Sequence, residues 1–158
     1  MLNLLQNSIQ LSENTQYDAF QSRNELQYAV KNYEDKDIIE KYGDISKWNV
    51  SNVIDMSHMF YDSEFNEDIS KWDVSNVIDM SFMFYTSDFN KDISNWDVSN
   101  VTDMSWMFYI SEFDRDISNW DVSNVVDMSC MFAHSKFNGD ISNYFEDGDV
   151  TGIRMRER

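Results

Sequence analysis

The sequence contains no proline, only four glycines and a single cysteine, Cys130. Asn, Asp and Ser must therefore make most of the turns, because the two commonest turn residues are absent or scarce. A lone cysteine cannot form an intrachain disulfide. No apolar run approaches the roughly 20 residues that a membrane-spanning helix needs. The sequence as printed predicts neither a disulfide scaffold nor a transmembrane helix.

Basic residues are also scarce, since 12 Lys and Arg face 29 Asp and Glu, and the net charge is −17. Such a charge repels phosphate backbones and anionic membrane surfaces, so we expect no nucleic-acid partner. It permits a basic protein partner, bound cations or simple solubility. The apolar content of 42% and the aromatic content of 15% argue against a disordered chain.

The first residues give no recognisable address for export. Residues 1–6 read MLNLLQ, with no basic start and with Asn3 and Gln6 interrupting the apolar stretch. A secretory signal peptide needs a charged start followed by a longer apolar run. The location therefore stays open between the cell surface and the cytoplasm.

A period of 24 residues organises most of the chain, because Trp48, Trp72, Trp96 and Trp120 recur at that spacing and Tyr144 takes the next place. Fifteen of the 24 positions are identical in all four units. The units, numbered 48–71, 72–95, 96–119 and 120–143, read WNVSNVIDMSHMFYDSEFNEDISK, WDVSNVIDMSFMFYTSDFNKDISN, WDVSNVTDMSWMFYISEFDRDISN and WDVSNVVDMSCMFAHSKFNGDISN. Such identity predicts tandem structural units that bury apolar residues against one another.

The apolar spacing inside a unit predicts one strand and one helical segment. Ile93, Trp96 and Val98 follow the spacing of a leucine-rich-repeat strand, and then Val101, Met104 and Phe108 follow a helical spacing. The expected fold class is an α/β repeat, a right-handed leucine-rich-repeat-like solenoid with a short strand and a short helical segment in each 24-residue turn.

Three regions are expected along the chain. Ser22 and Glu25 form a capping box before helically spaced apolar residues, and a second helical segment is expected at residues 35–41. We therefore predict a helical N-terminal cap over residues 1–42, in which 1–19 are weakly determined. Residues 43–144 would form the solenoid, with four full repeats and a partial fifth, and 145–158 a C-terminal tail.

The motif W-D-V-S-N-V-x-D-M-S-x-M-F, followed by F-N-x-D-I-S-x-W, resembles the repeat of BspA-type leucine-rich-repeat surface proteins. The resemblance covers residues 43–144 and extends to the lead-in from Glu25. It implies a surface-exposed, adhesin-like protein and brings no shared catalytic residues. Because residues 1–6 carry no recognisable export signal, the surface location is in question.

One position in each unit changes while its neighbours stay fixed, and it is occupied by His58, Phe82, Trp106 and Cys130. If Phe82 and Trp106 are exposed, they form an apolar patch that Tyr85 and Tyr109 extend, together with Tyr61. Such a patch is typical of an interaction surface. The alternative, that these rings fold over flanking side chains, stays equally open.

Asp73, Asp97 and Asp121 form a second candidate surface, a row of like charges that Asn49 begins. They could bind cations or a basic partner, but we favour carboxylates that accept hydrogen bonds from turn amides. Two further rows are expected to be structural, the Asn row for hydrogen bonds at corners and the Met pairs for the core: Asn52, Asn76, Asn100, Asn124; Met56/Met59, Met80/Met83, Met104/Met107, Met128/Met131.

The function expected from these features is non-enzymatic protein–protein interaction, with no cofactor, no bound metal and no catalytic residue. Cys130 and His134 could pair as thiol and imidazole, but no third catalytic group accompanies them. An alternative is a small acidic inhibitor that binds a basic partner by charge mimicry. A homo-oligomer through the C-terminal end of the repeats is a further expectation.

Overall fold

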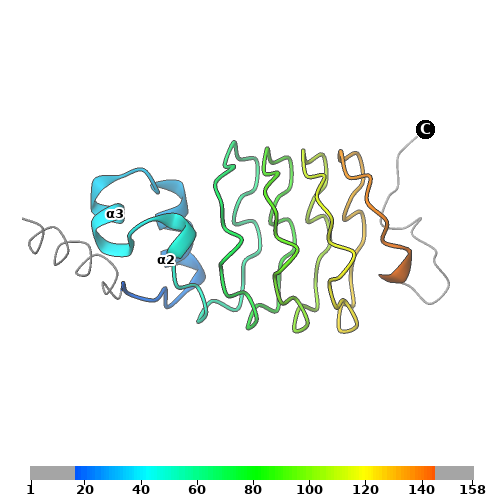
Figure 1. The fold of residues 1–158 in the computed structure, drawn as a ribbon, viewed down its shortest axis with the longest axis horizontal. Coiled ribbons are helices and arrows are strands. Elements are labelled where there is room, and N and C mark those ends of the chain that lie inside the picture. Colours follow the sequence, from blue (N-terminus) through cyan, green and yellow to red (C-terminus); the bar gives the residue numbers. More distant parts are fainter. Residues whose placement is uncertain (1–16, 145–158) are drawn as a thin grey trace, which may run out of the picture.

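The structure is a computed structural model, and it describes residues 17–144. Two α-helices lie at one end, and the 24-residue units follow as coils that lie side by side along the long axis (Figure 1). The predicted cap residues 1–16 and the predicted tail, 145–158, lie outside the described residues.

Helix α2 spans Arg23–Lys31, as the capping box predicts. The Ser22 hydroxyl accepts a hydrogen bond from the Glu25 amide, and the Glu25 carboxylate accepts one from the Gln21 amide at 2.8 Å. These bonds satisfy backbone donors that a helix start leaves unpaired. The apolar face of α2 is buried, with Leu26, Ala29 and Val30 at most 6% exposed.

Helix α3 spans Lys36–Tyr42 and confirms the second predicted helical segment. Asp35 caps its start by accepting from the Asp37 amide. Gly43 ends it with a φ of 70°, a left-handed conformation that glycine adopts without strain. The 3-10 helix η1, Ile45–Lys47, leads into the first unit, and η2, Ser142–Tyr144, lies at the end of the last one.

The predicted fold class is wrong. Within the described residues no strand forms, and the units contain neither the expected strand nor the expected helical segment. The pairing between units that could have made a parallel sheet is limited to isolated bridges, Asp55 with Asp79, Asp79 with Asp103, and Asp103 with Asp127. The right-handed leucine-rich-repeat-like solenoid is therefore not what the chain forms; most of each unit consists of turns and irregular backbone.

Residues with left-handed backbone explain why the predicted helical segment does not form. Two positions per unit have a positive φ between 50° and 59°, which stops a right-handed helix after a single turn. They are His58, Asp62, Phe82, Thr86, Trp106, Ile110, Cys130 and His134. The apolar spacing of Met104, Met107 and Phe108 therefore arises from consecutive turns, which bury these side chains as a helix would.

Alternate backbone amides in this segment join neighbouring units. The N–H groups of Met56, His58, Phe60 and Asp62 donate to the carbonyls of Asp79, Ser81, Met83 and Tyr85 at 2.8 to 3.0 Å. The intervening amides of Met59 and Tyr61 instead donate within their own unit. In this segment the bonds run only from each unit to the next, and no amide of residues 80–86 donates back to residues 56–62. The contact therefore remains a row of single hydrogen bonds without the reciprocal bonds of a strand ladder.

One apolar core runs through the units. The Trp that opens each unit is at most 4% exposed, and the Met and Phe residues of the first three units are at most 6% exposed, with the exception of Phe82, which is half-buried. The indole N–H groups of Trp72, Trp96 and Trp120 donate to the carbonyls of Ile45, Ile69 and Ile93, each 27 residues earlier. Each indole donor is thus satisfied by a carbonyl of an earlier unit or, for Trp72, by a carbonyl of η1.

Candidate protein-binding surface

Six aromatic side chains form two rows across the first three units, and we call them the aromatic strip: His58, Phe82 and Trp106 in one row, and Tyr61, Tyr85 and Tyr109 in the other. In the first row the ring centroids are 4.7 Å and 6.0 Å apart, and in the second 4.8 Å and 4.9 Å. His58 and Tyr61 are exposed, and the other four side chains are half-buried. The structure therefore brings Phe82, Trp106, Tyr85 and Tyr109 together at the surface.

The backbone of the strip departs from what bulky residues prefer. His58, Phe82 and Trp106 have φ values of 58°, 56° and 59°. The left-handed region is costly for residues with a large side chain, whereas Gly or Asn occupies it readily. The scaffold therefore does not require an aromatic residue at these three positions. This explains why the position varies between units while its neighbours are fixed.

The two rows also contact each other. Trp106 and Tyr109 lie 4.8 Å apart between ring centroids, and Phe82 and Tyr85 lie 5.7 Å apart. Burial raises the pKa of Tyr85, and negative charge on Tyr61 or Tyr109 would raise it further. The central phenol of the row therefore stays neutral, and its hydroxyl can both donate and accept a hydrogen bond.

The strip ends at the fourth unit, where smaller residues replace two of its rings. Cys130 follows Trp106 in the first row, and Ala133 follows Tyr109 in the second. The His134 ring packs edge-on against Tyr109 at 5.5 Å. No contact within the described residues pairs Cys130 with His134, and the single cysteine is half-buried and free.

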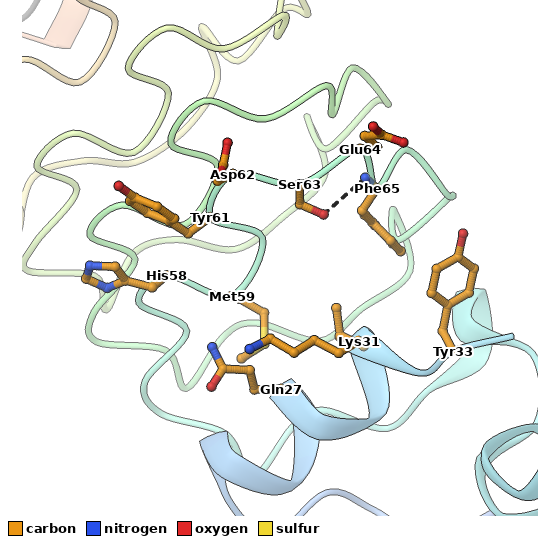
Figure 2. A pocket seen from close by; sticks show the side chains of 11 residues that line it. Gln27, Lys31, Tyr33, His58, Met59, Tyr61, Asp62, Ser63, Glu64 and Phe65 are labelled. Atoms are coloured by element: carbon orange, nitrogen blue, oxygen red, sulfur yellow. Dashed lines mark hydrogen bonds between the residues drawn. The ribbon is translucent and has the colours of Figure 1, made fainter. Parts of the chain in front are cut away.

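A groove adjoins the other end of the strip, between α2 and the first unit (Figure 2). Its volume is about 620 Å³, and it is lined by Gln27, Val30, Lys31, Tyr33, His58, Met59, Tyr61, Asp62, Ser63, Glu64 and Phe65. Val30, Met59 and Phe65 are the buried apolar residues of its lining. The Lys31 side chain extends along the groove beside Gln27 (Figure 2). The sequence did not predict the groove, because residues 27–33 and 58–65, which line it, are not related by any sequence spacing.

The Asp73, Asp97 and Asp121 carboxylates are exposed, and each accepts a hydrogen bond from a Ser amide two residues later. Asp73 and Asp97 also accept from the hydroxyls of those serines at 2.6 Å. The favoured structural interpretation of the Asp row is confirmed, since these are the turn bonds that short polar side chains make.

Hydrogen bonds from the serines lower the pKa of several carboxylates. For Asp97 and Asp121 the serine hydroxyl lowers the pKa most, and the serine amide lowers it further. The same Asp-x-Ser turn recurs at Asp127 and at Asp116, and both of these carboxyl pKa values are also lowered. The exposed carboxylates of these turns therefore remain ionised into the acidic range.

The two sets of residues predicted to be structural are confirmed for Asn76, Asn100 and Asn124 and for the Met pairs of the first three units, whereas Met128 is only half-buried. The side-chain amides of Asn76, Asn100 and Asn124 donate to the carbonyls of Ser51, Ser75 and Ser99 in the preceding units. The Met pairs of the first three units are at most 3% exposed. A row of exposed, mostly apolar residues beside the Asn row was missed, although its position also varies from unit to unit: Ile54, Ile78, Thr102 and Val126.

Within residues 17–144, no group of three His, Cys, Asp or Glu side chains is arranged to hold a metal ion. The helices of this part of the chain are also too short and too polar to cross a bilayer. The described features therefore consist of a single apolar core, turns built by Asp-x-Ser motifs, a surface strip of aromatic rings and an adjoining groove.

The chain is a protein of tandem 24-residue units with little regular secondary structure, and its aromatic strip and groove lie on the surface. Comparison with family models matches residues 24–144 to the family described as Mycoplasma protein of unknown function, DUF285, and the protein belongs to that family. No curated protein and no solved structure shows significant similarity to the chain.

Proposed function

We propose that this protein is a non-enzymatic binding module that holds a partner protein through the aromatic strip. The observation that carries the proposal is the strained, half-exposed position of Phe82 and Trp106. Large side chains in the left-handed region persist only where something offsets their conformational cost, and such residues gather at functional sites. Aromatic residues are also the side chains most enriched at the energetic centres of interfaces.

The likeness of the units to BspA-type surface proteins supports an adhesin-like form of this function. Tyr61, Tyr85 and Tyr109 add hydroxyl groups along the apolar rows. Rings that are already stacked lose little conformational freedom on binding, because their neighbours restrict them beforehand. The groove beside His58 and Tyr61 offers a pocket for a partner side chain at one end of the strip.

The carboxylates of the Asp-x-Ser turns favour a second candidate function, the binding of a basic partner by charge mimicry. These carboxylates recur in every unit, and hydrogen bonds from serine lower the pKa of Asp97, Asp121 and Asp127. With a net charge of −17, they would attract a basic surface and speed its approach. In this case the partner has a basic binding site whose usual ligand carries phosphates or carboxylates.

Capture of partners from a lysate of the producing cells separates the two candidates. The immobilised chain is compared with the Phe82→Asn/Trp106→Asn double variant and with a matched control, Ile54→Asn/Ile78→Asn, which changes exposed residues of another row. The captured proteins are washed at about 0.05 M and at about 0.5 M salt. The higher concentration weakens exposed ion pairs but not apolar contacts. Asn is used because it tolerates the left-handed backbone.

We expect a protein that the wild type and the control retain at both salt concentrations and that the double variant loses. Retention by the double variant at high salt would contradict binding through the strip. A basic protein that all three chains retain at low salt and lose at high salt would support charge mimicry instead.

A further inference from the structure

The last unit, 120–143, lacks the backbone partners that every earlier unit has. In the unit before it, four alternate amides donate to the next unit at 2.8 to 3.0 Å: those of Met104, Trp106, Phe108 and Ile110, to the carbonyls of Asp127, Ser129, Met131 and Ala133. The same four positions in the last unit are Met128, Cys130, Phe132 and His134. Among residues 17–144, no acceptor receives a hydrogen bond from these four amides.

Apolar side chains at the same edge are also incompletely covered. Val98, Val101 and Met104 are at most 1% exposed. Their counterparts in the last unit, Val122, Val125 and Met128, are only half-buried, although the residue types are the same. The edge therefore combines backbone donors that have no acceptor within residues 17–144 with apolar side chains that are only half-buried. In the earlier units the following unit accepts from these donors and covers these side chains.

Carbonyl groups flank the four donors. The carbonyls of Thr102 and Ser111 accept hydrogen bonds from the amides of Val126 and Lys136 in the following unit. The corresponding carbonyls of the last unit belong to Val126 and Ser135, and no amide within residues 17–144 donates to them. The edge thus presents an acceptor, four alternate donors and a second acceptor, and alternate carbonyls of an extended backbone can accept from such a row of donors.

A second copy of this chain fits the edge poorly. Two copies that met edge to edge would place amide donors opposite amide donors, which leaves the donors unsatisfied. The opposite end of the units is already covered, because Arg23 donates to the carbonyl of Ser57 at 3.0 Å and the Phe20 and Tyr42 rings pack on Trp48. A head-to-tail copy would have to displace these contacts.

We infer that this edge binds an extended peptide segment of a partner protein that carries basic side chains, independently of the aromatic strip. The carbonyls of the segment would accept from Met128, Cys130, Phe132 and His134. Basic side chains are specified because Asp121 and Asp127 stand exposed beside the edge and stay ionised. An acidic segment would meet like charge at close range.

The test uses the full chain and two blocked nine-residue peptides, one alternating valine with lysine and the other alternating valine with glutamate. Hydrogen exchange at single amides is followed by NMR, with and without peptide. We expect the lysine peptide to slow exchange at least about tenfold at the four edge amides, because a new hydrogen bond protects each of them. The amides of Met131 and Ala133, which bond within the unit, should not change.

A matched pair of variants tests the location. Val126 is 88% exposed beside the edge, and Thr102 occupies the same position one unit earlier. Val126→Arg should weaken lysine-peptide binding at least about tenfold, whereas Thr102→Arg should change it less than about twofold, since only the first places a cation at the edge. Equal effects of the two variants would place the peptide elsewhere.

Three other results would overturn the inference. The lysine peptide could leave exchange at the four amides unchanged. The amides could be protected in the free chain at every dilution and lose that protection when residues 145–158 are deleted, which would make this chain its own occupant. Protection that rises with protein concentration without peptide would assign the edge to a second copy.

Discussion

The units 96–119 and 120–143 have nearly the same sequence and yet differ in burial. Val98, Val101 and Met104 are buried, and the identical residues of the last unit, Val122, Val125 and Met128, are half-exposed. The difference arises because the following unit, and not the unit itself, covers these side chains. The stability that a residue contributes therefore depends on its place in the series as well as on its type.

The opposite end shows how a different structure performs the same task. Phe20 stacks on Tyr42 at 4.2 Å and packs on Trp48 at 5.0 Å, so residues outside the units bury the first Trp. Arg23 supplies side-chain donors to a backbone carbonyl of the first unit. A segment with an unrelated sequence can thus complete a unit if it provides apolar cover and hydrogen-bonding groups of the right polarity.

The largest effect is expected at this covered end. Phe20→Ala removes a fully buried ring, which should lower the free energy of unfolding by about 3–5 kcal/mol. Urea unfolding followed by tryptophan fluorescence measures the change. Tyr28→Ala, at a side chain that is 65% exposed, is the control and should change stability by less than about 0.5 kcal/mol. Similar losses in the two variants would mean that Phe20 does not cover the first unit.

The next effect compares the same residue in two units. Met104→Ala should lower the free energy of unfolding by about 2–5 kcal/mol, because Met104 is fully buried. Met128→Ala removes the same atoms from a half-buried site and should have less than half that effect. Parallel urea titrations of the two variants decide the point. If Met128→Ala were as damaging as Met104→Ala, the last unit would be covered as fully as the others.

The sequence predicted the parts of the fold that local chemistry decides. The capping box at Ser22 and Glu25 predicted the start of α2, and the 24-residue period predicted the burial of the Trp and Met positions. It failed on the backbone between them. Consecutive turns with left-handed residues bury Met104, Met107 and Phe108 as a helix would, so apolar spacing alone could not distinguish the two.

The candidate site was predictable to a similar extent. Variation at Phe82 and Trp106 between fixed neighbours identified the strip, because a position that the core does not dictate is free to vary. The groove was not predictable, since Lys31 and Glu64 line it together only through tertiary structure. The Asp-x-Ser motif at Asp103, which lies between the helically spaced Val101 and Met104, could have revealed a turn.

A smaller effect of opposite sign is expected at a strained position. Ile110 is a β-branched residue with a φ of 52°, and it is 46% exposed. Ile110→Asn should raise the free energy of unfolding by about 0.5–1 kcal/mol, because Asn tolerates this backbone far better. Asp62→Asn, at the equivalent position in the first unit, should have almost no effect, and thermal unfolding can compare the two. Destabilisation by Ile110→Asn would mean that its side chain packs more than its exposure indicates.

The smallest effect is a dependence on pH. Hydrogen bonds from Ser99 lower the pKa of Asp97 in the folded chain, so the unfolded chain binds a proton there first as the pH falls. The stabilisation is present above the unfolded pKa of about 3.9 and is lost as the pH falls through the folded value. Ser99→Ala removes the hydroxyl hydrogen bond, which lowers the pKa of Asp97 more than the amide does. Thermal stability should therefore fall less in this variant between about pH 5 and about pH 2. An unchanged or steeper acid loss in the variant would contradict this origin.

The claim at the centre of the functional account is that the strip's rings are held at the surface for binding and are not needed for folding. The free energy of unfolding of Phe82→Asn/Trp106→Asn tests it most directly. Lost ring contacts, at about 0.5–1.5 kcal/mol per pair, are offset by relief of about 1–2 kcal/mol at each left-handed residue. We predict a net loss below about 2 kcal/mol, whereas a loss of about 4 kcal/mol or more would show that the rings serve the fold.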